Sequence, residues 1–490
     1  MTRAIIIGSG IGGLAAAIRL ARRGVGVEVY EATDKAGGKI AERNLGGFRF
    51  DAGPSLLTLP ELVLELLDDD LRFPIKKLDV ITKYFYPDGT NLSAFSDVPK
   101  LAAEINEKLK VPKNKVTAYL QKASTVYDLT ADLFIFGSFH RIKNLMNLKA
   151  LKTVLNIRKL QAFSSLHQFN ERELGDKNLV QLFDRYATYN GSNPYQTPAT
   201  LSVISHLEHN MGAFIPEDGM YKVTESLMLQ AVRLGVEFHF GQPVRKVETA
   251  NGKATGVLLD SGFVAAEIVV SDVDIHRFYS TLLPDSKRLA KLNKEERSSS
   301  ALIFYWGMKG VSTELDVHNI FFSGSYQEEF DYLFRKKEVF DDPTVYIYIS
   351  SKYNKTDAPE GCENWFVMIN APADIGQNWD EIIERSRFNI LEKLEKMLGR
   401  ELMYNIVNEE ILSPPEIYKQ TGSVNGSLYG SSSNSRYASF YRHANFRSDI
   451  AGLYFVGGSV HPGGGIPLCL SSAKIVEELV EEQLLSNRHE

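Results

Sequence analysis

The sequence predicts an α/β protein in which a Rossmann-like nucleotide-binding domain is combined with a discontinuous α+β domain and a helical region. The chain opens on a strand, a glycine-rich loop, a helix and a second strand, which is the order of a parallel βαβ sheet. Stretches rich in aromatic and β-branched residues recur in the second half of the chain. At 490 residues the chain exceeds one ordinary core, so two or three subdomains are expected.

The elements can be justified in order. Residues 4–7 form an apolar run that is typical of a buried strand, and glycines begin directly after it. A helix is expected at 14–23, ended by Gly24, and a second strand at 25–30. Further helices are expected at 60–70, 98–110, within much of 114–210, at 379–398 and at 471–482, and further strands within 244–270 and at 301–308, 343–350, 364–371 and 452–456.

Composition and charge exclude several classes of protein. A formal net charge of −6 leaves no basic footprint, so no nucleic-acid partner is expected. Cys362 and Cys469 stand far apart, which argues against a disulfide framework and fits a reducing cytosol. No apolar run reaches the ~18 residues of a membrane-spanning helix, and no signal peptide precedes the first strand. A cytoplasmic location is therefore expected.

The glycine loop has the pattern of a dinucleotide site. Gly8, Gly10, Gly12 and Gly13 lie in a segment that satisfies G-x-G-x-x-G. These glycines permit the tight turn, the approach of a pyrophosphate and close packing of helix on strand, while N–H groups at the helix start stabilise the phosphates. Glu31 ends the second strand, where its carboxylate can accept hydrogen bonds from both ribose hydroxyls. The loop alone would serve NAD or FAD.

Two blocks that follow favour FAD. Residues 31–39, EATDKAGGK, resemble the extended fingerprint of the flavoprotein superfamily that contains amine oxidases and carotenoid desaturases. Residues 48–56 resemble the next block of that superfamily, which runs beside the flavin. Taken alone, the paired glycines at 37–38 and 46–47 would also suit hairpin turns. The cofactor contacts that the resemblance implies are Gly38, Lys39, Gly53, Ser55 and Leu56.

Two later blocks extend the resemblance. Residues 243–248 are similar to the segment whose valine backbone meets the adenine, here Val247. Residues 452–467 resemble the C-terminal flavin block, in which N–H groups at a helix start face the cofactor. Ser459 stands where many of these flavoproteins have aspartate, so a hydroxyl or backbone contact is expected there. The contacts implied in this block are Gly458, Gly465, Ile466 and Pro467.

The most specific mark is HPGGGIP at 461–467, followed by SSAK at 471–474. It resembles the phytoene-desaturase family of carotenoid desaturases, isomerases and retinol saturases. Residues 214–220 resemble the mid-chain block of that family, with Asp218 in place of the more usual glycine. The likeness is weakest over 300–415, and within the family the bacterial hydroxycarotenoid 3,4-desaturases look most similar. By family position, His276 and Arg436 are also implied near FAD.

The implied substrate is a hydrophobic polyene, a carotenoid, that must be collected from a bilayer. Residues 133–170 contain no Asp or Glu, and leucines recur in them at helical spacing. Such a stretch predicts contact with anionic headgroups and hence peripheral membrane association, whereas an ordinary surface helix with its leucines in the core is the alternative. Its basic side chains are Arg141, Lys143, Lys149, Lys152, Arg158 and Lys159.

These expectations divide the chain into five segments. The FAD-binding domain is assembled from three separate pieces, because the glycine loop, the adenine segment and the C-terminal flavin block lie far apart in the chain. A membrane-facing helical region and a substrate domain of sheet and helix are inserted between these pieces. The expected FAD-binding pieces are 1–90, 221–290 and 416–490, the helical region is 91–220, and the substrate domain is 291–415.

Desaturation removes a hydride and a proton from adjacent carbons, and the resemblance implies that flavin N5 accepts the hydride. The allylic cation loses its proton to even a weak base, so a strong dedicated base is not required. The candidates for it are His206, Glu208, His209 and His461, each equally open to a structural role. No cluster has metal-ligand spacing, so no metal is expected.

Two other functions remain open at this point. An amine oxidase of the same superfamily would need an aromatic cage for the amine, and it gives no reason for an acid-free basic stretch. A GDI-type escort shares the fold and carries prenylated partners without flavin chemistry. The glycines at both ends of the chain, with Glu31 and Lys39, argue against the escort. The absorption bands of flavin in the purified protein distinguish the escort from an enzyme.

Overall fold

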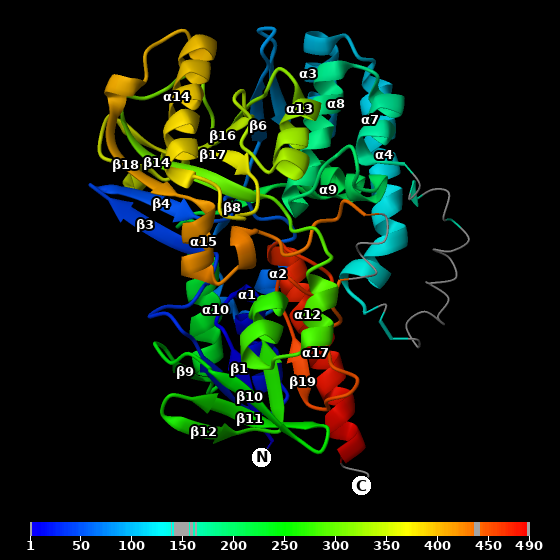
Figure 1. Ribbon diagram of the computed structural model, residues 1–490. Coiled ribbons are helices and arrows are strands. Elements are labelled where there is room, and N and C mark those ends of the chain that lie inside the picture. The colour runs from blue at the N-terminus through cyan, green and yellow to red at the C-terminus, as the bar shows by residue number, and fades with distance from the viewer. Residues whose placement is uncertain are drawn as a thin grey trace.

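The computed structural model describes residues 2–138, 140–141, 156, 160–161, 164–435 and 442–487, and it shows two lobes (Figure 1). The lower lobe holds a five-stranded parallel sheet, and both chain ends lie at its tip. The upper lobe holds a seven-stranded mixed sheet and most of the helices. The predicted α/β class is confirmed.

The parallel sheet takes its strands from three distant parts of the chain, in the order β19-β13-β1-β2-β9. Along β1 the side chains alternate: Ala4 and Ile6 pack against the helices of the lobe, whereas Ile5 and Ile7 pack against a small antiparallel sheet. The strands are β1 (Arg3–Ile7), β2 (Gly26–Tyr30), β9 (Glu237–His239), β13 (Ile268–Ser271) and β19 (Leu453–Phe455). The helices are α1 (Ile11–Arg22), α10 (Tyr221–Arg233) and α17 (Ile466–Asn487), and the small sheet consists of β10 (Lys246–Ala250), β11 (Lys253–Leu259) and β12 (Gly262–Ala265).

The second sheet has the order β18-β14-β17-β16-β15-β6-β7, and only the β6–β15 pair is parallel. α14 packs on it in one core cluster, while a second cluster joins its β6–β7 edge to the other helices. The strands are β6 (Val80–Phe85), β7 (Asn91–Phe95), β14 (Ser300–Lys309), β15 (His318–Phe321), β16 (Val345–Tyr348), β17 (Cys362–Ala371) and β18 (Ile406–Leu412). The helices are α3 (Val98–Leu109), α4 (Lys113–Thr130), α7 (Leu166–Leu174), α8 (Lys177–Asp184), α13 (Tyr326–Asp331) and α14 (Trp379–Leu398).

Shorter elements connect these sheets and helices. The hairpin β3–β4 and the pair β5–β8 lie between the lobes (Figure 1). Their bounds are β3 (Ala41–Leu45), β4 (Phe48–Ala52), β5 (Ile75–Lys77) and β8 (Phe214–Pro216). The short helices are α2 (Glu61–Leu64), α9 (Val203–His206), α11 (Ile275–Arg277), α12 (Ser286–Leu292) and α15 (Pro414–Thr421), and a π-helical turn, η6 (Leu207–Met211), follows α9.

The strand pairing moves the first predicted boundary, between the FAD-binding piece 1–90 and the helical region 91–220. β6 and β7 belong to the second sheet, so the chain leaves the nucleotide-binding lobe before β6 rather than at residue 90. Two helices also begin earlier than predicted. α1 starts at Ile11 because Gly12 and Gly13 adopt helical geometry in its first turn, and α17 starts at Ile466 because Pro467 is accommodated in its first turn.

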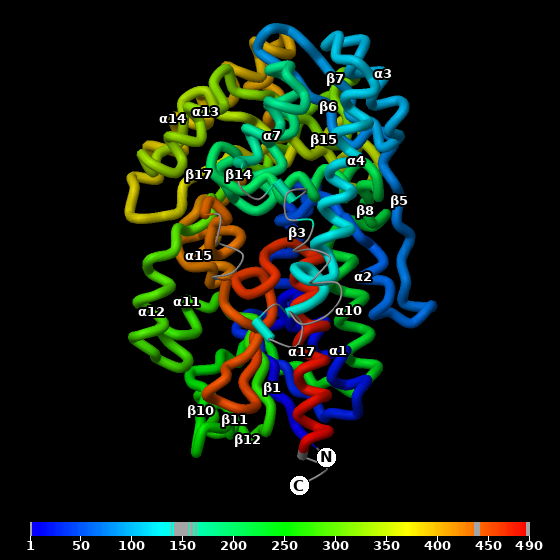
Figure 2. The backbone as a smooth tube through the Cα atoms, turned by 90° about the vertical axis from the view of Figure 1, so that its right-hand side faces the viewer, coloured from blue at the N-terminus to red at the C-terminus, as the bar shows by residue number. Residues whose placement is uncertain are grey.

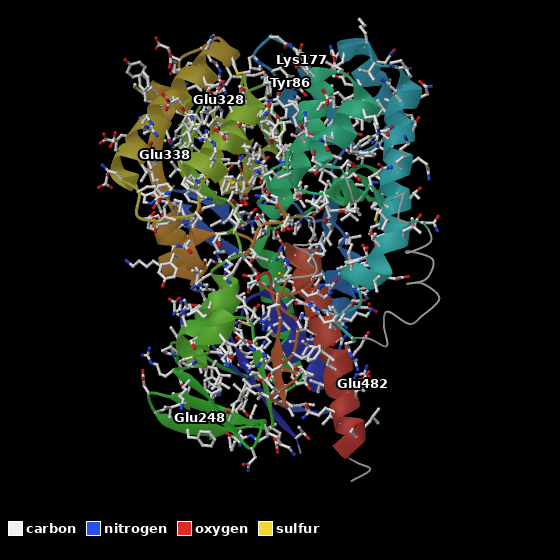
Figure 3. The ribbon with its side chains drawn as sticks, turned by 45° about the vertical axis from the view of Figure 1, so that its right-hand side comes forward. Tyr86, Lys177, Glu248, Glu328, Glu338 and Glu482 are labelled. Carbon is white, nitrogen blue, oxygen red and sulfur yellow. The ribbon has the colours of Figure 1, made fainter. Side chains whose placement is uncertain are left out.

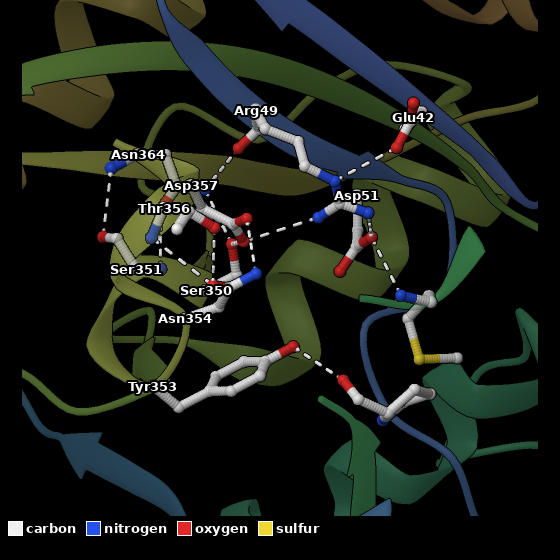
Figure 4. Close-up of polar contacts among 12 residues, drawn as sticks. Glu42, Arg49, Asp51, Ser350, Ser351, Tyr353, Asn354, Thr356, Asp357 and Asn364 are labelled. Carbon is white, nitrogen blue, oxygen red and sulfur yellow. Dashed lines mark hydrogen bonds and ion pairs between the residues drawn. The ribbon is translucent and has the colours of Figure 1, made fainter. Parts of the chain in front are cut away.

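A buried polar network around Arg49 joins the lobes (Figure 4). The Arg49 guanidinium on β4 donates to Asp51 at 2.9 Å and to Asp357 at 3.4 Å. Asp51 also accepts hydrogen bonds of 2.9 Å from the Tyr348 hydroxyl and from the backbone N–H of Met220. The network therefore ties β4 to the end of β16 and to the start of α10.

The predicted membrane-facing stretch is described only at its ends. Residue 139 and residues 142–155, which include Lys143, Lys149 and Lys152, lie outside the described residues, as do residues 157–159. Arg141 is described and forms an ion pair with Glu482 on α17, whose position Figure 3 shows. Figure 2 views this side of the molecule, with α4 and α7 facing the reader. No helix within the described ranges is long and apolar enough to cross a membrane.

Candidate active site

The glycine loop links β1 to α1 at the carboxyl end of the parallel sheet. The backbone N–H of Gly8 donates to the Tyr30 carbonyl at 2.9 Å, and the N–H of Leu14 donates to the Gly10 carbonyl at 2.9 Å. A Cβ at Gly13 would lie 2.2 Å from the Gly8 carbonyl oxygen, so only glycine permits this approach of helix to strand. The first N–H groups of a helix have no intrahelical acceptor and can bind an anion, and here the N–H of Gly13 donates to a carboxylate.

Asp272 lies at the centre of this loop and was missed by the sequence analysis. It follows β13, and its carboxylate accepts a hydrogen bond of 3.0 Å from the backbone N–H of Gly13. Burial raises the pKa of Asp272 to about 7, an effect that the Gly13 hydrogen bond opposes and the nearby Glu31 carboxylate reinforces. A carboxylate directly after a parallel strand was the available signal, because ligands bind at that edge of such sheets.

Glu31 closes the loop from the end of β2. Its carboxylate accepts hydrogen bonds of 2.8 Å from the backbone N–H and the hydroxyl of Ser9. It accepts hydrogen bonds of 2.9 Å from the backbone N–H and the hydroxyl of Thr33. The carboxylate is therefore placed to accept from hydroxyl groups at the strand end, which is the chemistry that a ribose requires.

Lys39 lies beside the C-terminal flavin block. The residue is accessible to solvent, yet desolvation by the surrounding protein lowers its pKa, partly offset by Asp274 and Cys469. The Lys39 Nζ donates to the Leu428 carbonyl at 2.6 Å. Gly53 lies directly against the Lys39 carbonyl, so the two predicted flavin blocks are in contact.

The C-terminal block brings a second helix N-terminus to this region. Gly465 has φ +108°, and among the described residues a Cβ there would meet no atom within 4 Å. α17 begins directly after it, and the Cys469 N–H donates to the Gly465 carbonyl at 2.9 Å. The Ser459 hydroxyl, which stands in place of the usual aspartate, accepts a hydrogen bond of 3.0 Å from the Ile275 N–H. The Gly458 carbonyl accepts from Arg442 at 3.1 Å.

These residues fit FAD. The N-termini of α1 and α17 and the glycine loop supply N–H groups for a diphosphate. Glu31 supplies an acceptor for ribose hydroxyls. Lys39 is close enough to Cys469, in the first turn of α17, to perturb its pKa, which burial raises to about 12. The open side of Gly465 leaves space at the start of α17, and bound FAD would supply a hydride acceptor there.

The geometry above does not test three of the predicted cofactor residues. Val247 is fully buried in the core between β10 and the parallel sheet. The His276 ring lies 2.5 Å from the Asn293 side-chain oxygen. Arg436 lies outside the described residues. The roles of these three residues stay predictions. Ser55 lies between the lobes, where its hydroxyl contacts the second sheet.

Glu208 and His209 belong to a buried cluster on η6. Glu208 accepts from Arg185 at 3.2 Å and from the Tyr186 hydroxyl at 2.8 Å, and Tyr189 binds its second oxygen. His209 Nε2 lies 2.7 Å from the same Tyr186 hydroxyl. Burial lowers the pKa of His209, so its ring is neutral at neutral pH. Each of these two catalytic candidates is already engaged with the protein.

His206 and His461 lie in two different places. His206 Nδ1 is 2.7 Å from the Asn210 side-chain nitrogen, on the side of α9 that meets α4. His461 is in the C-terminal flavin block, and its Nε2 lies 2.8 Å from the Gly137 carbonyl. Burial lowers the pKa of His461 to about 3. The structure therefore does not gather the four candidates into one catalytic group, and His461 alone belongs to a cofactor block.

Comparison with known proteins agrees with this geometry. Residues 11–297 match the family model of flavin-containing amine oxidoreductases. The chain is 46% identical over 484 residues to the 1-hydroxycarotenoid 3,4-desaturase of Flavobacterium sp. (strain P99-3), covering 98% of this chain and 99% of that protein. It is 30% identical over 494 residues to 4,4'-diaponeurosporene oxygenase of Staphylococcus aureus (strain MSSA476), covering 99% of both. It is 29% identical over 510 residues to phytoene desaturase of Fusarium fujikuroi, covering 97% and 88%.

Solved structures share the fold at low sequence identity. An oxidoreductase from Methanosarcina mazei has a TM-score of 0.65 at 17% identity, covering 97% of this chain and 100% of that chain. Putrescine oxidase bound to putrescine has a TM-score of 0.64 at 16% identity, covering 99% of both. The fold, the cofactor site and the full-length relatives together show that the chain belongs to the FAD-dependent carotenoid desaturases of the flavin-containing amine oxidoreductase family.

Proposed function

We propose that the protein is a hydroxycarotenoid 3,4-desaturase, which oxidises the C3–C4 single bond of a carotenoid that carries a hydroxyl group at C1. The observation that carries the proposal is the 46% identity to the Flavobacterium enzyme along 98% of this chain. The cofactor site supports it, because desaturation needs a two-electron acceptor beside the substrate.

The reaction removes a hydride from one carbon and a proton from its neighbour, and the electron pair of the second C–H bond becomes the new double bond. FAD, when bound, would supply the hydride acceptor. The N-termini of α1 and α17 would hold its diphosphate, and the Glu31 carboxylate would accept from a ribose hydroxyl. An allylic cation is acidic enough to lose its proton to a weak base, so no strongly basic side chain is needed.

We also propose that the enzyme works in the cytoplasm at the surface of a membrane. Carotenoids are insoluble and reside in bilayers, and the acid-free basic stretch at 133–170 would attract anionic headgroups. Arg141 is not assigned to headgroup binding, because it is paired with Glu482. The contribution is therefore assigned to the lysines and the arginine that lie outside the described residues.

The two other functions are not favoured. The resemblance to putrescine oxidase is at 16% identity and supports the fold alone, not an amine substrate. An escort without flavin chemistry would have no use for an open helix N-terminus at Gly465 or for the Glu31 carboxylate on the glycine loop.

Co-expression in bacteria that accumulate defined carotenoids tests the proposal. One strain supplies an acyclic carotenoid with a C1 hydroxyl, and a second strain supplies the same carbon skeleton without it. We expect the pigment of the first strain to shift its absorption to longer wavelength, because each new conjugated double bond lowers the excitation energy. Unchanged pigment in that strain, with flavin bound to the expressed protein, would contradict the proposed substrate.

A further inference from the structure

A short chain of hydrogen bonds crosses from the cofactor lobe to the second sheet. The hydroxyl oxygens of Ser55, in the loop after β4, and Tyr346, on β16, are 2.5 Å apart. The Tyr346 hydroxyl also lies 2.7 Å from Nδ1 of His318 on β15. The His318 ring stacks on Tyr348 with a centroid distance of 5.0 Å, and Tyr348 is held by Asp51. The network around Arg49 therefore fixes the His318 end of these hydrogen bonds.

Tyr346 is only partly buried. Desolvation nevertheless raises the pKa of its phenol. The Lys39 Nζ donates to the Leu428 carbonyl. Leu428, Leu56 and Tyr346 pack against one core cluster. One core cluster therefore packs against both Tyr346 and Leu428, the residue whose carbonyl accepts from Lys39.

The hydrogen-bonded chain of Ser55, Tyr346 and His318 has an unused hydrogen-bonding position. Burial, reinforced by the nearby Arg185 guanidinium, lowers the pKa of His318 to about 3, so its ring is neutral. Neutral imidazole offers one donor and one acceptor. Whichever role Nδ1 takes toward Tyr346, the Ser55–Tyr346 pair retains an unused donor or lone pair. Within the described residues, Nε2 of His318 is also buried without a partner.

The surroundings suit a neutral alcohol rather than an ion. Ser55, Tyr346 and His318 carry no charge at neutral pH. Leu56 and Met368, which is opposite Tyr346 in the β16–β17 pairing, provide apolar neighbours. A carboxylate or an ammonium group would find no counter-charge in the chain itself, whereas a hydroxyl can both donate and accept.

We propose that the Ser55–Tyr346–His318 chain binds the hydroxyl group of the carotenoid and thereby selects the bond that is oxidised. The inference rests on the proposed function, because a hydroxyl at C1 is two carbons away from C3. Holding that hydroxyl would fix the position of the C3–C4 bond relative to the bound cofactor. An analogue without the hydroxyl leaves buried polar groups unpaired, which costs roughly 10- to 100-fold in binding.

Single-turnover reduction of the enzyme-bound flavin tests this subsite. Purified holoenzyme is mixed without oxygen with the C1-hydroxylated carotenoid or with its dehydroxylated analogue, each in detergent micelles. The ratio of the two second-order rates of flavin bleaching is the readout, so any general effect on flavin cancels. We expect the wild type to favour the hydroxylated carotenoid, and Tyr346→Phe and Ser55→Ala to lower that ratio at least tenfold. Tyr305→Phe, a tyrosine of the same core cluster outside the chain, should keep the wild-type ratio.

The outcomes separate the subsite from the function. Bleaching by neither carotenoid in the wild type would overturn the proposed function. A wild-type preference that survives in both Tyr346→Phe and Ser55→Ala would overturn the subsite while the function stands. Equal flavin content and melting temperature in all variants show that the comparison is made on folded protein. If one variant does not fold, the other decides the question.

Discussion

The carboxylate of Asp272 accepts a hydrogen bond of 3.0 Å from the backbone N–H of Gly13, in the first turn of α1. A negative side chain thus occupies the kind of helix N-terminus at which this fold holds an anionic phosphate. Burial raises the pKa of Asp272 to about 7. Two anions in one buried site repel each other, so we expect protonation of Asp272 and binding of FAD to favour each other.

Asp272→Asn should remove a pH dependence of stability. The folded pKa of about 7 lies above the ordinary aspartate value of ~3.9. The stabilisation by the protonated form is therefore fully present below about pH 4 and is lost as the pH rises through 7. The free energy of unfolding falls by roughly 4 kcal/mol over this range. We expect the melting temperature of the wild type, relative to the variant, to fall between about pH 4 and pH 7. Equal pH slopes for both proteins would contradict the assignment.

Glu31→Ala should lower FAD occupancy while the protein stays folded. The carboxylate holds Ser9 and Thr33 at the strand end and is the acceptor that a ribose needs there. The ratio of flavin to protein absorbance measures occupancy, and circular dichroism measures the fold. Glu28→Ala removes a carboxylate from the same strand that binds Arg3 and Tyr30 instead. This control should keep its flavin, and full occupancy in both variants would place the ribose elsewhere.

Arg49→Ala should destabilise the joint between the lobes. It leaves the buried carboxylates of Asp51 and Asp357 without their cation, a change that typically costs about 3–5 kcal/mol. Denaturant unfolding monitored by flavin release and by circular dichroism measures the loss. Arg233→Ala removes an exposed ion pair with Asp70 and should have little effect. Similar stability of the two variants would show that the Arg49 network does not hold the lobes together.

Charge reversal at Lys149, Lys152 and Lys159 should weaken binding to anionic liposomes. Each lysine near a negatively charged bilayer contributes about 1 kcal/mol, or roughly fivefold in affinity. Co-sedimentation with vesicles of anionic and of neutral lipid measures the effect. Reversal of the exposed Lys287, Lys291 and Lys294, at and beyond α12, is the matched control. Unchanged sedimentation of the first variant would dismiss the membrane proposal.

The regular elements could be predicted because local pattern determines them. α14 spans the predicted residues 379–398, and the strands of the parallel sheet coincide with apolar runs in the sequence. The first predicted boundary was misplaced because β6 and β7 look like any strands, and only pairing with β15 assigns them to the second sheet. Pairing between segments far apart in the chain leaves no local signal.

Pairing between distant segments also explains which residues of the candidate site were missed. The glycine loop, Glu31 and Gly465 carry motifs, and the structure brings them to one edge of the sheet. Asp272 is 259 residues away from its partner Gly13, and Ser55 is 291 residues away from Tyr346. No spacing in the sequence relates such pairs. The catalytic histidine candidates show the converse, because their buried hydrogen bonds appear only in the folded chain.

Oxygen-free mixing of the holoenzyme with one equivalent of a C1-hydroxylated acyclic carotenoid tests the central claim most directly. Flavin absorbance and the carotenoid spectrum are followed together, and the product is identified by mass. We predict bleached flavin, a carotenoid two hydrogens lighter, and a spectrum shifted to longer wavelength, in equal amounts. Flavin that stays oxidised while the carotenoid is bound and unchanged would contradict the assignment of this protein as a hydroxycarotenoid desaturase.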